Sequence, residues 1–125
     1  LGDQVVPGVA KTIAELRKRG KQILFVSNNA TKHRSTYMSK FKKMGVEASM
    51  DEVITSAVCA ARYFVSVCGK GAKVFVCGTQ GLVDEMKDAG AVPVLPAYVL
   101  SKEVSQDAPA FVEEGIDSEI KGVVA

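Results

Sequence analysis

The most informative segment of this 125-residue chain is Lys21-Gln22-Ile23-Leu24-Phe25-Val26-Ser27-Asn28-Asn29-Ala30-Thr31. Its first half is a short apolar run, which suits a parallel strand covered on both faces of a sheet. Small polar residues then end that run abruptly. In an open α/β sheet, ligands collect beyond the carboxyl ends of the strands. The segment therefore predicts a buried strand whose carboxyl end carries a polar site.

Apolar residues at helical spacing flank this strand on both sides. Residues 7–20 predict a helix with a proline in its first turn and a glycine at its end, and a second helix is predicted to end near Gly45. The later pattern predicts a strand at 53–55, a helix at 57–69, a strand at 73–77, a helix at 82–90 and a weaker strand at 91–94. Alternation of helices and apolar strands predicts the α/β class.

The two ends of the sequence predict that it is an internal fragment of a longer protein. The chain opens on Leu1, and its final apolar run, Val123–Ala125, is typical of the start of a buried strand. The order helix, glycine, strand predicts one more parallel strand ahead of Leu1. We therefore expect exposed apolar strand edges, with association or partial disorder mainly after Pro96.

Composition and charge narrow the classes of function. The chain is 47% hydrophobic and 24% charged with a net charge of +2, which predicts a soluble domain that binds neither nucleic acid nor a membrane surface. Its apolar runs are too short to span a bilayer. Cys59, Cys68 and Cys77 form an odd set without a CxxC pair. We expect them to be reduced, mostly buried thiols of a cytoplasmic protein.

The polar groups after Val26 suit a phosphoryl group. Ser27 offers a hydroxyl, Asn28 and Asn29 offer carboxamide donors, and the loop adds free backbone N–H groups. An ordinary turn is the alternative interpretation, because asparagine tolerates the left-handed geometry with which a chain often leaves a strand. Local chemistry alone leaves both interpretations open.

Five segments resemble the haloacid dehalogenase superfamily, in the branch that contains 4-nitrophenylphosphatases and phosphoglycolate phosphatases. They are Gly2–Gly8, Gly20-Lys21, Phe25–Arg34, Ile54–Tyr63 and Val76–Leu82, and the match runs from Gly2 to about Gly90. The resemblance implies a partial Rossmann-like core with a serine motif over residues 1–65. The first part of an α/β cap would follow over residues 66–125.

The resemblance also implies a mechanism. In the family, an aspartate attacks phosphorus to form an aspartyl-phosphate, a second aspartate protonates the leaving group, and Mg²⁺ neutralises the charge. Ser27 matches the serine that hydrogen-bonds the phosphoryl group, and Asn28 and Asn29 match residues that line the phosphate pocket. The implied substrate is a small phosphorylated metabolite, and the branch often forms homodimers through its cap.

The sequence departs from the family pattern at the reacting groups. No Asp-x-Asp-Gly motif occurs in the 125 residues, so the nucleophile, the acid and the metal ligands are all missing from the match. We therefore expect this chain by itself to be inactive. A pseudoenzyme that has lost these groups is an alternative.

Two further features allow other interpretations. Gly78-Thr79-Gln80-Gly81 between a strand and a helix resembles a degenerate nucleotide- or dinucleotide-binding loop, although the full GxGxxG is missing. His33 is predicted to be solvated rather than catalytic. Its neighbours Lys32 and Arg34 either attract an anionic substrate or simply begin a solvated helix.

Overall fold

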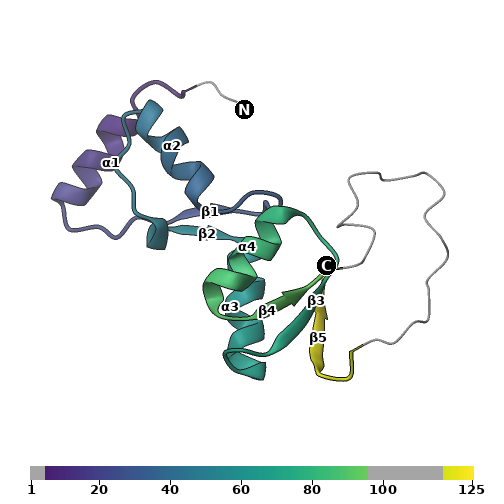
Figure 1. Cartoon of the computed structure of the whole chain (residues 1–125). Helices are drawn as coiled ribbons and strands as arrows, with labels where there is room; N and C mark the ends of the chain where they lie inside the picture. Colours follow the sequence, from purple (N-terminus) through teal and green to yellow (C-terminus); the bar gives the residue numbers. More distant parts are fainter. Residues whose placement is uncertain (1–4, 96–116) are drawn as a thin grey trace, which may run out of the picture.

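Helices and strands alternate along the part of the chain that the computed structural model describes, residues 5–95 and 117–125 (Figure 1). The elements are α1 Val9–Lys18, β1 Phe25–Ser27, α2 Ser35–Lys43, a 3-10 helix Met50–Glu52, β2 Val53–Thr55, α3 Ser56–Cys68, β3 Lys73–Val76, α4 Gln80–Ala89, β4 Val92–Val94 and β5 Ile120–Val124. The α/β class is confirmed. The disorder predicted after Pro96 concerns residues 96–116, which lie outside the described ranges.

The first group of elements is built on the parallel pair β1–β2. Phe25 pairs with Val53 and Ser27 pairs with Thr55, so both strands end at the same edge of the sheet. Helix α2 packs on this pair, because the rings of Phe25 and Phe41 lie 4.3 Å apart between centroids. This arrangement places the residues after Ser27 at the carboxyl edge, as the sequence predicts.

The prediction that this strand is covered on both faces is wrong for the chain as described. Regular strand structure begins only at Phe25, and the side chain of Val26 is 77% exposed. Side chains alternate across a strand, so Val26 points away from the face on which Phe25 contacts α2. Within the described residues β1 pairs with β2 alone, and the face that carries Val26 is exposed.

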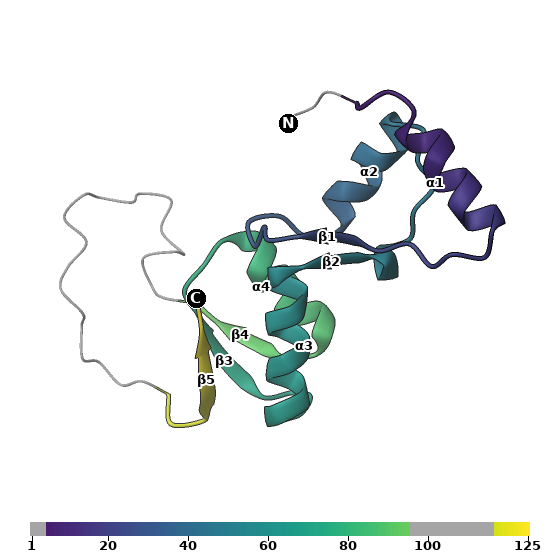
Figure 2. The ribbon, with the colours of Figure 1, turned by 180° about the vertical axis from the view of Figure 1, so that it is seen from behind.

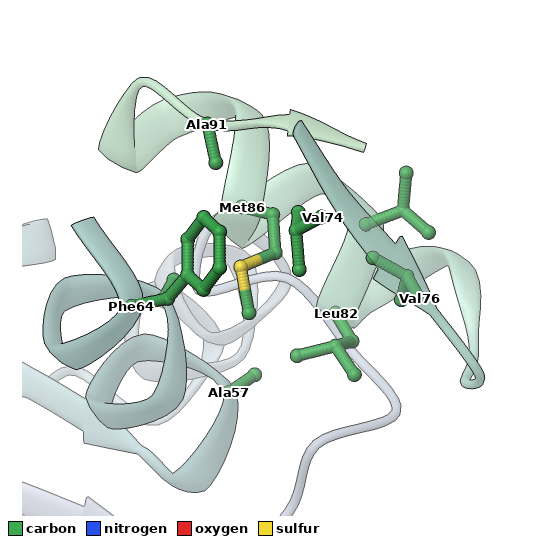
Figure 3. Packing of buried hydrophobic residues seen from close by; sticks show 9 residues of the cluster. Ala57, Phe64, Val74, Val76, Leu82, Met86 and Ala91 are labelled. Carbon is green, nitrogen blue, oxygen red and sulfur yellow. The ribbon is translucent and has the colours of Figure 1, made fainter. Parts of the chain in front are cut away.

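The second group is a parallel three-stranded sheet in the order β4–β3–β5, with α3 and α4 packed against it (Figure 2). Figure 3 shows its core, in which the Met86 side chain of α4 lies between Phe64 of α3 and Val74 of β3. Val74 and Met86 are fully buried. Because α3 contributes Ala57 and Phe64 to this core, its packing favours a boundary near Ser56. The division into residues 1–65 and 66–125 stays a prediction.

Ladder pairing joins β5 to β3, and a partly exposed ion-pair cluster lies at the start of β5. Lys73 Nζ donates to Asp117 Oδ2 at 2.8 Å and also binds Glu119. The bond from Lys73 lowers the pKa of the Asp117 carboxyl, and the two carboxylates raise the pKa of Lys73. The final apolar run is a strand, as predicted, but it is not a buried one here. Val123 is 66% exposed because its side chain points to the face of the sheet opposite the core.

The three cysteines are free thiols, as expected, but they are not mostly buried. Cys59 and Cys77 are exposed, and Cys68 is half-buried. Cys59 lies on the outer face of α3, opposite the face that Ala57 and Ala61 bury, and Cys77 follows the end of β3. None of the described helices combines the length and the apolar character needed to cross a membrane.

A paired arginine and glutamate join α1 to the entry of β2. Arg17 donates to both carboxylate oxygens of Glu52, at 2.6 and 2.8 Å, and Glu52 Oε2 also accepts the backbone N–H of Ser49 at 2.9 Å. The bond from Arg17, followed by that from Ser49, lowers the pKa of Glu52 from 4.5 to about 2. The pair therefore fixes α1 against the turn that leads into β2.

This lowered pKa makes the stability of the first group depend on pH. A carboxyl whose pKa is lower in the folded state stabilises the fold above its unfolded pKa, and this contribution is lost as the pH falls through the folded pKa. We expect Glu52→Gln to lower the melting temperature at pH 7. The difference from the wild type should shrink as the pH falls from about 4.5 towards 2.

Thermal unfolding followed by circular dichroism across this pH range measures the effect. Glu15→Gln is the matched control, since Glu15 pairs with Arg19 on the solvent side of the same helix, where an exposed pair contributes little. A Glu52→Gln deficit that stays constant from pH 7 to pH 2 contradicts the assignment.

Candidate functional site

The site begins where β1 ends, at the carboxyl edge of the β1–β2 pair. Ser27 is half-buried there, next to Thr55. The Thr55 hydroxyl is already in use, because it accepts the backbone N–H of Val58 at 3.2 Å and caps α3. Within residues 5–95 and 117–125, the Ser27 hydroxyl makes no hydrogen bond. It is therefore free to bond a ligand at the sheet edge.

The two asparagines after Ser27 differ in what they can offer. Asn28 is exposed, and the described part of the chain provides no hydrogen-bond partner for its side chain. Asn29 Oδ1 accepts the backbone N–H of Thr31 at 2.8 Å and the Thr31 hydroxyl at 2.7 Å. This is an Asx turn, which shapes the loop. The carbonyl of Asn29 thus has a structural role, and its amide N–H₂ remains a donor.

Residues 27–34, called the serine loop below, lie against the first turns of α4 (Figures 1 and 2). Thr79 Oγ1 donates to the carbonyl of Ala30 at 3.2 Å. Gly81 touches the loop backbone so closely that a Cβ there would lie 2.5 Å from Thr31 O and 2.6 Å from Lys32 N. The glycine therefore permits a backbone contact that no larger residue allows.

Four polar side chains complete the contact between the serine loop and α4. Arg34 donates through Nε to Glu85 Oε2 at 2.9 Å, and its backbone N–H donates to Glu85 Oε1 at 2.8 Å. His33 Nε2 donates to Asp88 Oδ2 at 2.9 Å. The side chains of Glu85, Arg34 and His33 are only 1%, 11% and 19% exposed. We call His33, Arg34, Glu85 and Asp88 the loop–helix cluster.

This cluster corrects two predictions about the basic residues of the loop. His33 is not solvated, because Asp88 binds one ring nitrogen and Ser35 binds the other at 2.8 Å. Arg34 neither attracts a substrate from solvent nor begins a solvated helix, since its guanidinium lies on the buried Glu85. The side chains of both residues contact carboxylates of α4 instead of pointing into solvent. Lys32 is exposed and stays compatible with either interpretation.

The sequence analysis did not identify the carboxylates of α4 as partners of the loop, although the position of Glu85 indicates that it is paired. Leu82, Val83 and Met86 mark the apolar face of the helix, and Glu85 falls on that same face, three residues after Leu82. A charged group on a buried face requires a partner of opposite charge. That requirement identifies Glu85 as paired, but the sequence does not say that its partner is Arg34.

The loop–helix cluster is the one group within the described residues that could supply three metal ligands. Suitable atoms of His33, Glu85 and Asp88 lie within 4.8 Å of one another. Both oxygens of Glu85 already accept hydrogen bonds from Arg34, and the Arg34 guanidinium lies 3.9 Å from Asp88. A cation here would have to displace an arginine. The residues therefore fit an ion-pair network rather than a Mg²⁺ site, and Mg²⁺ also prefers ligands that are all oxygen.

The Gly78–Gly81 turn does not have the form of a dinucleotide site. A phosphate bound there would need open space at the N-terminus of α4. The backbone of Thr31 and Lys32 occupies that space at Gly81. A Cβ at Gly78 would in turn meet the Leu82 side chain at 2.8 Å. Packing within the chain thus accounts for both glycines.

A pocket of about 160 Å³ lies beside the loop–helix cluster rather than at the sheet edge. Arg34, Asp51, Arg62, Glu85 and Asp88 supply its polar lining, whereas Ser27, Asn28 and Asn29 take no part in it. The polar groups after β1 thus lie at the sheet edge, outside this pocket.

These features define the class of the protein: an α/β protein with free polar side chains at the carboxyl edge of a parallel strand pair. The family model for haloacid dehalogenase-like hydrolases matches residues 1–92. The chain belongs to the haloacid dehalogenase-like hydrolase family.

Curated relatives confirm the branch that the sequence resembles. A 4-nitrophenylphosphatase from Schizosaccharomyces pombe is 40% identical over 116 residues, which cover 86% of this chain and 39% of that protein. The chloroplastic phosphoglycolate phosphatase 1A of Arabidopsis thaliana is 39% identical over 90 residues, covering 71% of this chain and 25% of that protein. The chain thus spans between 25% and 39% of the length of these relatives.

Solved structures agree with this assignment. A p-nitrophenyl phosphatase from Archaeoglobus fulgidus superposes with a TM-score of 0.67 at 32% identity, covering 74% of this chain and 35% of that one. A glycerol phosphate phosphatase from Mycobacterium tuberculosis, solved in complex with magnesium, gives a TM-score of 0.63 at 30% identity and covers 74% and 27%.

The close contact of Gly81 with the serine loop predicts the sign of the stability change in Gly81→Ala. In an open helix, Gly→Ala stabilises by about 1 kcal/mol. At Gly81 the added methyl must push the serine loop away, and overpacking of this kind costs about 1–3 kcal/mol. We expect Gly81→Ala to lower the free energy of unfolding, as measured by urea denaturation.

Gly78→Ala is the matched control. Its added methyl meets the flexible end of Leu82, which can move, so we expect a smaller loss of stability. A Gly81→Ala variant that is more stable than the wild type would show that the loop does not lie against α4.

Proposed function

We propose that the serine loop is the phosphoryl-binding element of a phosphatase that acts on a small phosphorylated metabolite. One observation carries the proposal. The hydroxyl of Ser27 stands at the carboxyl edge of β1, half-buried and without a hydrogen-bond partner among the described residues, next to a threonine whose hydroxyl is already bonded. A polar group left free in such a place is suited to bind a ligand.

Each side chain would make a different contact with the phosphoryl group. The Ser27 hydroxyl donates to one phosphoryl oxygen, and the exposed Asn28 amide donates to a second. Asn29 keeps its N–H₂ for the ligand while its carbonyl holds the Thr31 turn. All three are neutral, so they orient the phosphoryl group without competing for a cation. Their contribution is binding and alignment of the reacting phosphorus.

The bond-breaking groups would come from elsewhere in the intact protein. Family membership implies an aspartate nucleophile and an aspartate acid, and the 125 residues contain no Asp-x-Asp-Gly motif. Mg²⁺ would supply charge neutralisation in the intact enzyme, as the magnesium complex of the M. tuberculosis relative suggests. We therefore propose that the described residues bind and orient the phosphoryl group but do not react with it.

Two further proposals concern the setting of the intact protein. The free cysteines, two of them exposed, favour a reducing compartment such as the cytoplasm. A homodimer formed through the cap rests on the family resemblance alone.

The proposal is tested by two activity measurements with 4-nitrophenyl phosphate and Mg²⁺. The isolated 125-residue chain is expected to show no turnover above the buffer rate. In an intact protein that carries this chain, Ser27→Ala is expected to lower kcat by about 10²-fold, the typical effect of removing one donor to a developing oxyanion.

Thr31→Ala is a control for loop shape, because Thr31 contacts Asn29 but offers no group at the sheet edge. Turnover by the isolated chain contradicts the assignment of its role. An intact protein with no turnover at all would be a pseudoenzyme. If Ser27→Ala leaves the turnover of the intact protein unchanged, the phosphate binds elsewhere.

A further inference from the structure

Helix α4 and its N-cap residue Thr79 contact the serine loop at three successive positions. Thr79 bonds the carbonyl of Ala30, Gly81 touches the backbone of Thr31 and Lys32, and Glu85 bonds Arg34. These contacts lie on the side of the loop that faces α4, whereas the free groups of Ser27 and Asn28 belong to the sheet edge. The loop is thus fixed on one side and open for a ligand on the other.

We propose that Glu85 is a positioning residue for phosphoryl binding, which it controls from α4 by holding Arg34 at the end of the serine loop. This inference rests on the proposed function of that loop. Glu85 would not touch the phosphate. Its role is to keep the loop backbone in the one arrangement in which the donors of Ser27 and Asn28 point to the same ligand.

The contacts of Glu85 are suited to this role. One oxygen accepts both the backbone N–H and the Nε of Arg34, and the other accepts Nε at 2.9 Å. Bonding to the backbone as well as to the side chain fixes the path of the main chain and not only the position of the guanidinium. These bonds are made away from bulk solvent, because the Glu85 side chain is 1% exposed.

Two other sets of bonds hold parts of the loop. The Asn29 turn closes only as far as Thr31, and at the start of α2 the carbonyls of His33 and Arg34 accept the N–H groups of Thr36 and Tyr37. The attachment of residues 32–34 to α4 rests on the loop–helix cluster and on the contact of Gly81 with Lys32. If Glu85 lost its charge, residues 32–34 would adopt more conformations in the free protein. Ligand binding would then have to restrict them, which costs conformational entropy and weakens the affinity.

The size of the effect follows from the entropy of ordering a chain. Fixing the backbone of one residue costs conformational entropy, and the cost for a single residue corresponds to about a tenfold change in affinity. Release of even one loop residue therefore predicts about a tenfold weaker affinity for a phosphoryl ligand in Glu85→Gln.

The experiment compares Glu85→Gln with Glu52→Gln in the full 125-residue chain. Both variants remove one charge from an Arg–Glu pair, but Glu52 pairs with Arg17, away from the serine loop. Circular dichroism first defines a temperature at which both variants are folded. Titration with inorganic vanadate, followed by amide NMR shifts, then gives each dissociation constant, and hydrogen exchange of the amides of residues 28–34 is measured without ligand.

The expected result is a dissociation constant about tenfold higher in Glu85→Gln, with faster exchange at the Thr31 and Arg34 amides, while Glu52→Gln matches the wild type in both measurements. Unchanged loop exchange in Glu85→Gln overturns the inference whether or not vanadate binds. Equal changes in both variants overturn it too, since they would show a general loss of stability.

Failure of the proposed function gives a different pattern. In that case vanadate does not change the NMR shifts of the Ser27 and Asn28 amides in the wild type. The positioning role of Glu85 is then rejected together with the proposed function. Saturable binding in the wild type with an unchanged constant in Glu85→Gln rejects the positioning role alone.

Discussion

A buried carboxylate on an otherwise apolar helix face imposes the main constraint on this structure. Glu85 lies among Leu82, Val83 and Met86, and its side chain is almost completely removed from water. A charge in that position must be paired, and leaving it unpaired costs about 3–5 kcal/mol. Its partner is Arg34, so the end of the serine loop is tied to α4. The geometry of the candidate site depends on this pairing.

The constraint links two parts of the chain that differ in packing. The second group has a closed core around Met86 and Phe64, whereas the first has a short strand pair with Val26 exposed. The serine loop belongs to the first group by sequence but is held mainly by the second. A loop supported by the better packed element can keep its donors in place although its own strand is open on one face.

Much of the fold could be predicted because it follows from local patterns. Spacing of apolar residues and the positions of glycines placed the helices and strands, and the polar turn after Val26 fell at the carboxyl edge as expected. The burial of β1 could not be predicted, because the exposure of Val26 depends on which elements lie next to the strand. The apolar run predicts only that the strand is suited to be covered.

The polar groups of the candidate site could be predicted from the sequence, but the contacts that hold the serine loop in place could not. Ser27 and Asn28 could be identified from residue type and position after a strand. The roles of His33 and Arg34 depend on carboxylates more than fifty residues later in the chain, brought near by the fold. Local sequence has no information on such pairs, and a basic residue at a helix start normally indicates a solvated surface. The same limit explains why Gly81, a packing glycine, resembled part of a nucleotide loop.

Titration of the chain with inorganic vanadate, followed by amide NMR, decides whether the polar turn after β1 binds a phosphoryl group. We predict saturable shifts centred on Ser27, Asn28 and Asn29, which are lost in Ser27→Ala while the fold is retained. Shifts centred on the N-terminus of α4 at Thr79–Gly81, or an identical response in Ser27→Ala, would contradict this role of the turn.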